Sequence, residues 1–206
     1  MTAHPEIQTD QLASVRADAA RLHFHPRGTV RCVGAPLFRN QVARDLGCLL
    51  DLDPAVVEWS CLPLVLHRRG DSHVPDFLVL REEGACLLDS FAAASDPRDR
   101  WNEQAAAEIG FRYSAWSADD LRAGYTLDNA KDLLRYARWH CPLGDRVRLL
   151  AALDDNGSLT VAECIPAFRE APPIAGFSSL VLHRFVEIDL DEARIGPETA
   201  VRRIRS

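Results

Sequence analysis

Two short apolar segments joined by a tight turn constrain the fold of this chain more than any other feature. Residues 74–81 and 85–91 are rich in Val, Leu and Phe, and two glutamates and a glycine lie between them. Apolar runs of this length, separated by a turn that contains glycine, predict a β-hairpin. The first strand carries Asp76 and the second carries Asp89. The hairpin therefore places two carboxylates on neighbouring strands.

Helical and strand-like segments surround this hairpin on both sides. The alternation of helices and strands up to about residue 143 predicts an α/β domain. Beyond it, short helices followed by two extended pieces are typical of a winged-helix domain. The chain is thus divided into an N-terminal helical arm (1–35), an α/β domain (36–143) and a small winged-helix-like domain (144–206). Predicted helices are 9–22, 37–50, 96–110, 127–140, 146–153, 159–168 and 177–185, and predicted strands are 56–61, 64–68, 74–81, 85–91, 111–116, 186–190 and 199–204.

The amino-acid composition limits the binding partners and the cellular compartment that we expect for this chain. The 206 residues are enough to bury a sizeable core, and the net charge of −6 is unlike the basic excess of free-standing nucleic-acid binders. Any contact with DNA would need a local arginine patch or help from a partner. The six cysteines show no C-x-x-C spacing, and the first ten residues lack the basic and apolar regions of a signal peptide. No stretch is apolar enough for a membrane span, so we expect a cytoplasmic protein with reduced cysteines and no membrane partner.

The paired acids of the hairpin are a familiar arrangement in restriction-endonuclease-like folds, which this region resembles. There, two carboxylates on adjacent strands hold Mg²⁺, and a lysine two residues after the second acid orients or activates water. This chain has a single lysine, Lys131, and it lies far from the hairpin in the sequence. Two residues after Asp89 the chain has Phe91 instead.

The wider sequence resembles the N-terminal domain of TnsA-type transposon endonucleases. The resemblance lies in the order of segments over about residues 36–140 and, more loosely, in the tail after residue 189. It implies a restriction-endonuclease-like fold, with a mixed sheet flanked by helices, for the domain at 36–143, and a role in handling mobile or foreign DNA. The segments that carry it are 39–45, 49–56, 62–63, the hairpin at Asp76, 110–113, 128–129 and 133–138.

The departures from that family fall on the catalytic positions. Ala43 stands where the family has a helix glutamate, and Phe91 stands where it has the lysine. Asp76 matches the metal-binding aspartate, and Asp89 keeps an acid at the second position. We therefore expect no resident metal at these four vestigial positions, with Phe91 facing inward near Ala43 and the two aspartates paired with Arg44 or another arginine. If the site were active, Asp76 and Asp89 would hold Mg²⁺.

The C-terminal segment and the loops supply the candidates for DNA contact. The predicted helix 177–185 would be the recognition helix of a winged helix, but its residues are mostly apolar, which favours packing or protein contact over base reading. Candidate DNA-binding residues are Arg44, Arg68, Arg69, Arg184, Arg202 and Arg203.

Three functions are compatible with these features. The leading hypothesis is a catalytically degenerate TnsA-like protein, not itself an enzyme, that serves as a DNA-associated or protein-binding component of a larger complex. It implies a protein partner and allows double-stranded DNA as a second one. The first alternative is an active Mg²⁺-dependent DNA endonuclease with a rearranged site around Asp76 and Asp89. The second is a winged-helix transcriptional regulator.

Overall fold

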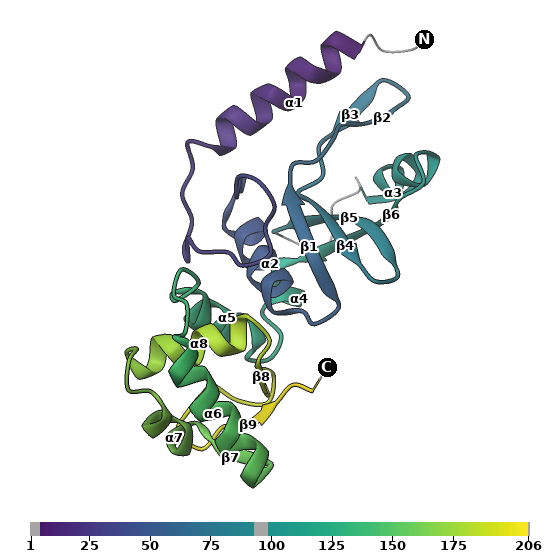
Figure 1. The fold of residues 1–206 in the computed structure, drawn as a ribbon. Helices are drawn as coiled ribbons and strands as arrows, with labels where there is room; N and C mark the ends of the chain where they lie inside the picture. Colours follow the sequence, from purple (N-terminus) through teal and green to yellow (C-terminus); the bar gives the residue numbers. More distant parts are fainter. Residues whose placement is uncertain (1–4, 93–98, 206) are drawn as a thin grey trace. The chain divides into compact units, whose positions relative to one another are not determined.

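The computed structural model describes residues 5–92 and 99–205 (Figure 1). They form two compact units, of which unit 1 comprises residues 1–25 and 31–122 and unit 2 comprises residues 26–30 and 123–206. The division falls after Arg122, about twenty residues before the expected boundary at 143. It does so because the helix at 126–134, which the sequence places in the first domain, packs against the helix at 173–182 of unit 2.

Unit 1 is built around a four-stranded mixed sheet of order β1-β4-β5-β6 (Figure 1). The first three strands are antiparallel neighbours, whereas β5 and β6 are parallel and α3 connects them. The expected α/β class, with a mixed sheet flanked by helices, is confirmed. The elements of unit 1 are α1 (Pro5–Ala19), α2 (Gln41–Leu52), β1 (Val56–Cys61), β2 (Leu66–Arg68), β3 (Asp71–His73), β4 (Phe77–Arg81), β5 (Gly84–Phe91), α3 (Asp99–Glu108), β6 (Arg112–Ser117) and α4 (Ala118–Leu121).

Successive residues of a strand point to opposite faces of the sheet. Apolar residues therefore lie on both faces of this sheet, and helices cover both. Trp59 and Phe77 lie on one face and form an aromatic cluster with Phe38, which lies just before α2. On the opposite face, Leu87 packs with Ala105 of α3 and with residues of β2. The core of unit 1 therefore has two parts, one on each side of the hairpin that carries the paired acids.

The outer side of β1 is also occupied. The backbone of the segment Arg31–Val33 runs alongside it, with Trp59 N–H donating to Arg31 C=O at 3.0 Å and Val33 N–H donating to Trp59 C=O at 2.8 Å. The guanidinium of Arg16 in α1 donates two hydrogen bonds to the carbonyl of Leu62, at 3.1 and 2.9 Å. The N-terminal arm is thus attached to the sheet domain.

Unit 2 combines short helices with a three-stranded sheet of order β7-β9-β8. Both of its strand pairs are antiparallel, so β9 lies in the middle. The strand β7 is an addition to the two strands predicted from the sequence. The elements of unit 2 are α5 (Thr126–Leu134), α6 (Leu143–Asn156), β7 (Ser158–Thr160), α7 (Val161–Cys164), the 3₁₀ helix η1 (Ile165–Ala167), α8 (Pro173–Leu182), β8 (Val186–Ile188) and β9 (Ala200–Arg203).

The helix α8 is buried on all sides over most of its length. Every residue from Ala175 to Leu182 is buried, including Ser178 and Ser179. A helix that is apolar all round is a core helix, and α5, η1 and β8 are the elements that pack against it. Across residues 5–92 and 99–205, no helix combines the length and apolarity that crossing a membrane requires.

Candidate functional site

The two acids of the hairpin meet in the structure. Asp76 lies directly before β4 and Asp89 lies near the end of β5, and the register pairs Phe77 with Leu88. The backbone N–H of Asp76 donates to Asp89 Oδ1 at 2.9 Å. Asp76 is 2% exposed and Asp89 is 6% exposed, so both carboxylates are shielded from bulk water. Two buried carboxylates this close need a positive charge or a proton between them.

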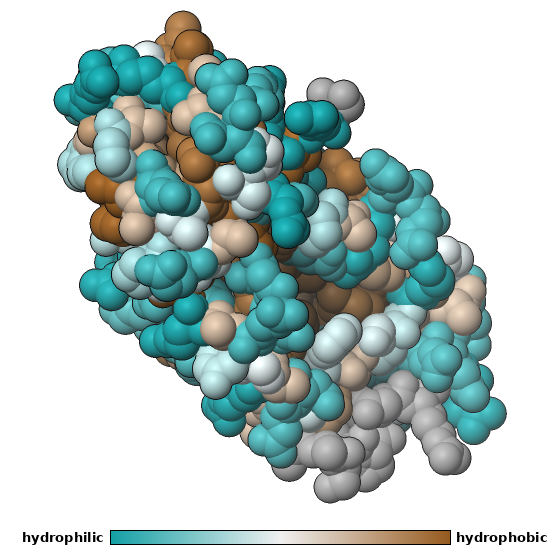
Figure 2. All heavy atoms as spheres, turned by 90° about the horizontal axis from the view of Figure 1, so that it is seen from below, coloured by the Kyte–Doolittle hydropathy of each residue, from teal (hydrophilic) through white to brown (hydrophobic). Residues whose placement is uncertain are grey.

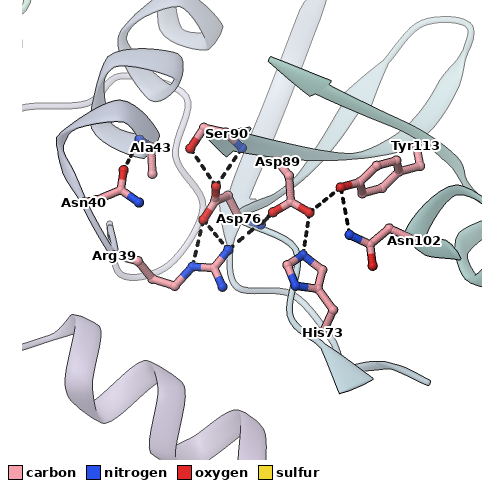
Figure 3. Close-up of polar contacts among 9 residues, drawn as sticks. All are labelled: Arg39, Asn40, Ala43, His73, Asp76, Asp89, Ser90, Asn102 and Tyr113. Atoms are coloured by element: carbon pink, nitrogen blue, oxygen red, sulfur yellow. Dashed lines mark hydrogen bonds and ion pairs between the residues drawn. The ribbon is translucent and has the colours of Figure 1, made fainter. Parts of the chain in front are cut away.

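Arg39 supplies that charge (Figure 3). Its Nε and Nη2 atoms donate to Asp76 Oδ1 at 2.9 and 2.6 Å, and Nη2 also donates to Asp89 Oδ1 at 3.3 Å. Arg39 is positioned by the start of α2, where the Asn40 side chain caps the helix by accepting from Ala43 N–H at 2.8 Å. The guanidinium therefore lies where a cation bridging the two acids would lie.

The remaining carboxylate oxygens also have partners. Asp76 Oδ2 accepts from the backbone N–H and the hydroxyl of Ser90, at 2.9 and 2.8 Å. Asp89 Oδ2 lies 2.5 Å from His73 Nε2 and accepts from the Tyr113 hydroxyl at 2.7 Å. These contacts form one connected cluster (Figure 3), which holds both carboxylates in fixed orientations.

The pKa of Asp76 reflects the charges and the burial of the cluster. Burial raises the pKa of its carboxyl, the Arg39 guanidinium lowers it, and the neighbouring Asp89 carboxylate raises it, with a net shift upward. Arg39 therefore offsets only part of the cost of burying two acids. A site whose carboxylates are this strongly desolvated depends on its arginine for stability.

The residues present do not fit a magnesium ion. Mg²⁺ prefers about six oxygen ligands in octahedral geometry, including water. Here Ala43 offers a methyl group in place of a carboxylate, and Arg39 and Ser90 already occupy the oxygens of Asp76. Among the residues that the structure describes, no group of three or more His, Cys, Asp or Glu is arranged to hold a metal ion.

The other two site positions predicted from the sequence, Ala43 and Phe91, differ in burial. Ala43 is buried, with 1% of its surface exposed, in the first turn of α2. Phe91 ends β5 and is half-buried, so the direction in which we expect its ring to point stays a prediction. By strand alternation its side chain shares a face of the sheet with Asp89.

Four residues of the cluster, Arg39, His73, Ser90 and Tyr113, are not among the site residues predicted from the sequence. The sequence could have identified Arg39, because this residue directly precedes the N-cap of the helix that bears Ala43. Tyr113 is brought to Asp89 by the parallel register of β5 and β6, which pairs it with Leu87. No local sequence pattern specifies that register.

The candidate DNA-binding arginines differ in burial and in pairing. Arg44 is fully buried and its guanidinium stacks on Phe38, with 4.9 Å to the ring centroid, so it is not at the surface. Arg68 is paired with Glu108 at 3.2 Å, and Arg69 is exposed in the β2–β3 turn.

In unit 2, Arg184 is half-buried, Arg203 is paired with Asp154, and Arg202 is exposed on β9. On the face drawn in Figure 2, hydrophilic residues predominate, with hydrophobic side chains gathered in separate patches between them. The arginines named from the sequence are thus split between the two units, and two of them, Arg68 and Arg203, pair with acids.

Comparison with known proteins adds no family to these observations. No protein-family model matches the chain, and a comparison with curated protein sequences found no match.

Proposed function

We propose that this protein is a catalytically degenerate relative of TnsA-type transposon endonucleases. In this proposal it serves as a DNA-associated or protein-binding component of a larger complex that handles mobile or foreign DNA. Its nuclease-like unit is a scaffold whose surface, and not its former active site, makes the contacts.

The order of elements in unit 1 supports the scaffold part of the proposal. A helix, three antiparallel strands, a second helix and a parallel fourth strand follow one another as α2, β1, β4, β5, α3 and β6. This is the arrangement that the sequence resemblance implies for a restriction-endonuclease-like domain. Asp76 and Asp89 lie together in it, on the strands where such a domain carries its metal ligands.

The position of Arg39 is the main observation that supports a loss of catalysis. Its guanidinium binds both aspartates at once, at 2.6 to 3.3 Å. An arginine stays protonated, so it cannot act as a base or activate water. With Ala43 and Phe91 in place of the glutamate and the lysine, the cluster keeps two acids whose negative charge is partly offset by Arg39.

Unit 2 supports a protein-contact role over base reading. The order α6, β7, α7, α8, β8 and β9, with β9 in the middle of the sheet, matches that of a winged helix. The helix that would read DNA in such a domain is α8, and its residues from Ala175 to Leu182 are buried. A buried helix cannot present side chains to a DNA groove, which counts against the regulator hypothesis.

A nuclease assay tests the proposal. We expect no cleavage of supercoiled plasmid above background with Mg²⁺ or Mn²⁺, and the same background from Asp76→Ala as a matched control. Metal-dependent nicking that disappears in Asp76→Ala would refute the degenerate site and establish the endonuclease alternative, because only that alternative uses Asp76 in chemistry.

A further inference from the structure

The sheet of unit 1 has one covered edge and one open edge. The segment Arg31–Val33 lies against the outer side of β1. At the other end, β6 is paired with β5 on its inner side, and among residues 5–92 and 99–205 no strand is paired with its outer side. Edge strands present unpaired N–H and C=O groups that can pair with another strand.

The sequence of β6 does little to prevent such pairing. Natural edge strands are protected by proline, by a β-bulge or by several charges. Residues 112–117 read Arg-Tyr-Ser-Ala-Trp-Ser, with one charge and no proline, and the β5–β6 register shows no irregularity. Six residues are a full-length strand, so this edge is long enough to pair.

One face of β6 is exposed and adjoins an apolar groove. Arg112, Ser114 and Trp116 alternate onto this face, and Trp116 is 42% exposed. The groove has a volume of about 330 Å³. Besides these three residues it is lined by leucines of α2 and by residues of the neighbouring strands, among them Leu46, Leu49, Leu50, Cys86 and Leu88. The helix α2 thus leaves part of the sheet beside β6 uncovered.

We propose that β6 pairs antiparallel with β6 of a second copy of this chain, about a two-fold axis at Ser114. The pairing would join the two four-stranded sheets into one continuous sheet. A two-fold interface must be self-complementary, because each residue meets the residue related to it by the axis. The strand meets that requirement in this register.

The register places Arg112 of each copy opposite Trp116 of the other. A guanidinium over an indole ring is a favourable pair, worth roughly 0.5–1 kcal/mol at an exposed site. Ser114 meets its own copy on the axis, and on the other face Tyr113 meets Ala115. No like charges face each other, and the partner's Trp116 covers the end of the groove that Arg112 lines.

The charge on Arg112 is available for this contact. Its present partner is Glu83 at 3.5 Å, and the two side chains are 60% and 67% exposed. An exposed ion pair at this distance contributes little free energy. In the dimer, Arg112 would exchange this ion pair for a contact with the partner's Trp116. Because that contact also shields Trp116 from water, the exchange favours the dimer.

Sedimentation equilibrium of the full chain, with charge variants, tests the interface. We expect a monomer–dimer equilibrium in the wild type. Ser114→Lys should raise the dissociation constant roughly fivefold or more, because two lysines then face each other on the axis. Ser158→Lys, at an exposed serine of β7 in the other unit, is the matched control and should leave it within about twofold.

Cross-linking gives a positive signal that is specific to this register. Directly opposed strand residues have Cα atoms roughly 4.5–5.5 Å apart, which suits a disulfide. With oxidised glutathione as the oxidant, which is reduced to two thiols, Ser114→Cys should form a covalent dimer, and the wild type and Ser158→Cys should not. A protein that stays monomeric at several hundred micromolar with no Ser114→Cys cross-link would overturn the proposal. So would a dimer that is unaffected by Ser114→Lys and not cross-linked.

Discussion

Arg39 gives the buried Asp76–Asp89 pair a permanent positive charge on a planar group. The guanidinium donates two hydrogen bonds to Asp76 and one to Asp89, which a lysine ammonium could not do with the same geometry. Because the carboxylates are desolvated, removing this charge would leave them uncompensated. At the scale of residues, the one described arginine that contacts both acids is Arg39.

A second buried acid is stabilised differently, by backbone donors. Asp145 in α6 accepts from the N–H groups of Arg169, Glu170 and Ala171 and from the Arg148 side chain. Burial alone would raise the pKa of its carboxyl, but these hydrogen bonds lower it from the ordinary 3.8 to about 2. Asp145 therefore fastens the loop at 169–171 to α6 while it is ionised.

The lowered pKa of Asp145 predicts a pH-dependent stability. The folded pKa lies below the unfolded value, so the contribution of the ionised group is fully present above about pH 4 and is lost as the pH falls towards 2. Asp145→Asn should lower the free energy of unfolding by about 1–2 kcal/mol at pH 7. Urea denaturation of both proteins at pH 7 and near pH 2 measures this, and a difference that does not shrink with acidification would contradict it.

At the scale of elements, a close backbone contact lies where α5 ends. The amphipathic pattern predicts a helix over 127–140, but α5 ends at Leu134. The segment 26–30 packs here, and a Cβ added to Gly28 would lie 2.6 Å from Ala137 Cβ and 3.0 Å from the Leu134 carbonyl oxygen. Only glycine allows this approach without a shift of the neighbours.

Gly28→Ala should therefore destabilise the protein. The clash involves a methyl group and a backbone oxygen, neither of which is the end of a flexible side chain, so we expect a loss of about 1–3 kcal/mol. Gly196→Ala is the control, because the nearest atom to its added Cβ is 3.8 Å away. Chemical denaturation measures both, and equal midpoints for the two variants would show that the contact is not formed.

Some of the strands could be predicted from the sequence and others could not. The strand at 56–61 is confirmed to the residue, because apolar runs between turn signals leave few alternatives. The hairpin around Gly84 is also confirmed, although β4 begins at Phe77, three residues later than predicted. Ser117 caps α4 and forms a capping box with Asp120. The three-residue strands β3 and β7 were not predicted, because so short a segment has no periodicity of its own.

The candidate site divides in the same way. The approach of Asp76 to Asp89 is specified locally by the hairpin and was predicted, as was their pairing with an arginine. The identity of that arginine was not, because Arg39 reaches the acids through the packing of α2 on the sheet. His73 is positioned by the β2–β3 hairpin, and Tyr113 is positioned by the parallel register of β5 and β6. Both placements depend on contacts between residues that are distant in the sequence.

At the scale of the whole molecule, two compact units carry different surfaces and a net charge of −6. In unit 1, no other strand among residues 5–92 and 99–205 pairs with the outer side of β6, and unit 2 buries the helix α8 that a DNA-reading winged helix would expose. An acidic chain with its arginines dispersed is expected to bind duplex DNA only weakly alone. These features together favour assembly with other proteins over independent action on DNA.

The central claim is that Arg39 fills the role of the cation between Asp76 and Asp89. Isothermal titration calorimetry with Mn²⁺ tests it most directly, using the wild type and Asp76→Asn in parallel. The account predicts no saturable binding up to several millimolar Mn²⁺ in either protein, because the guanidinium and Ser90 already occupy the ligand oxygens. Saturable binding by the wild type that Asp76→Asn abolishes would contradict it.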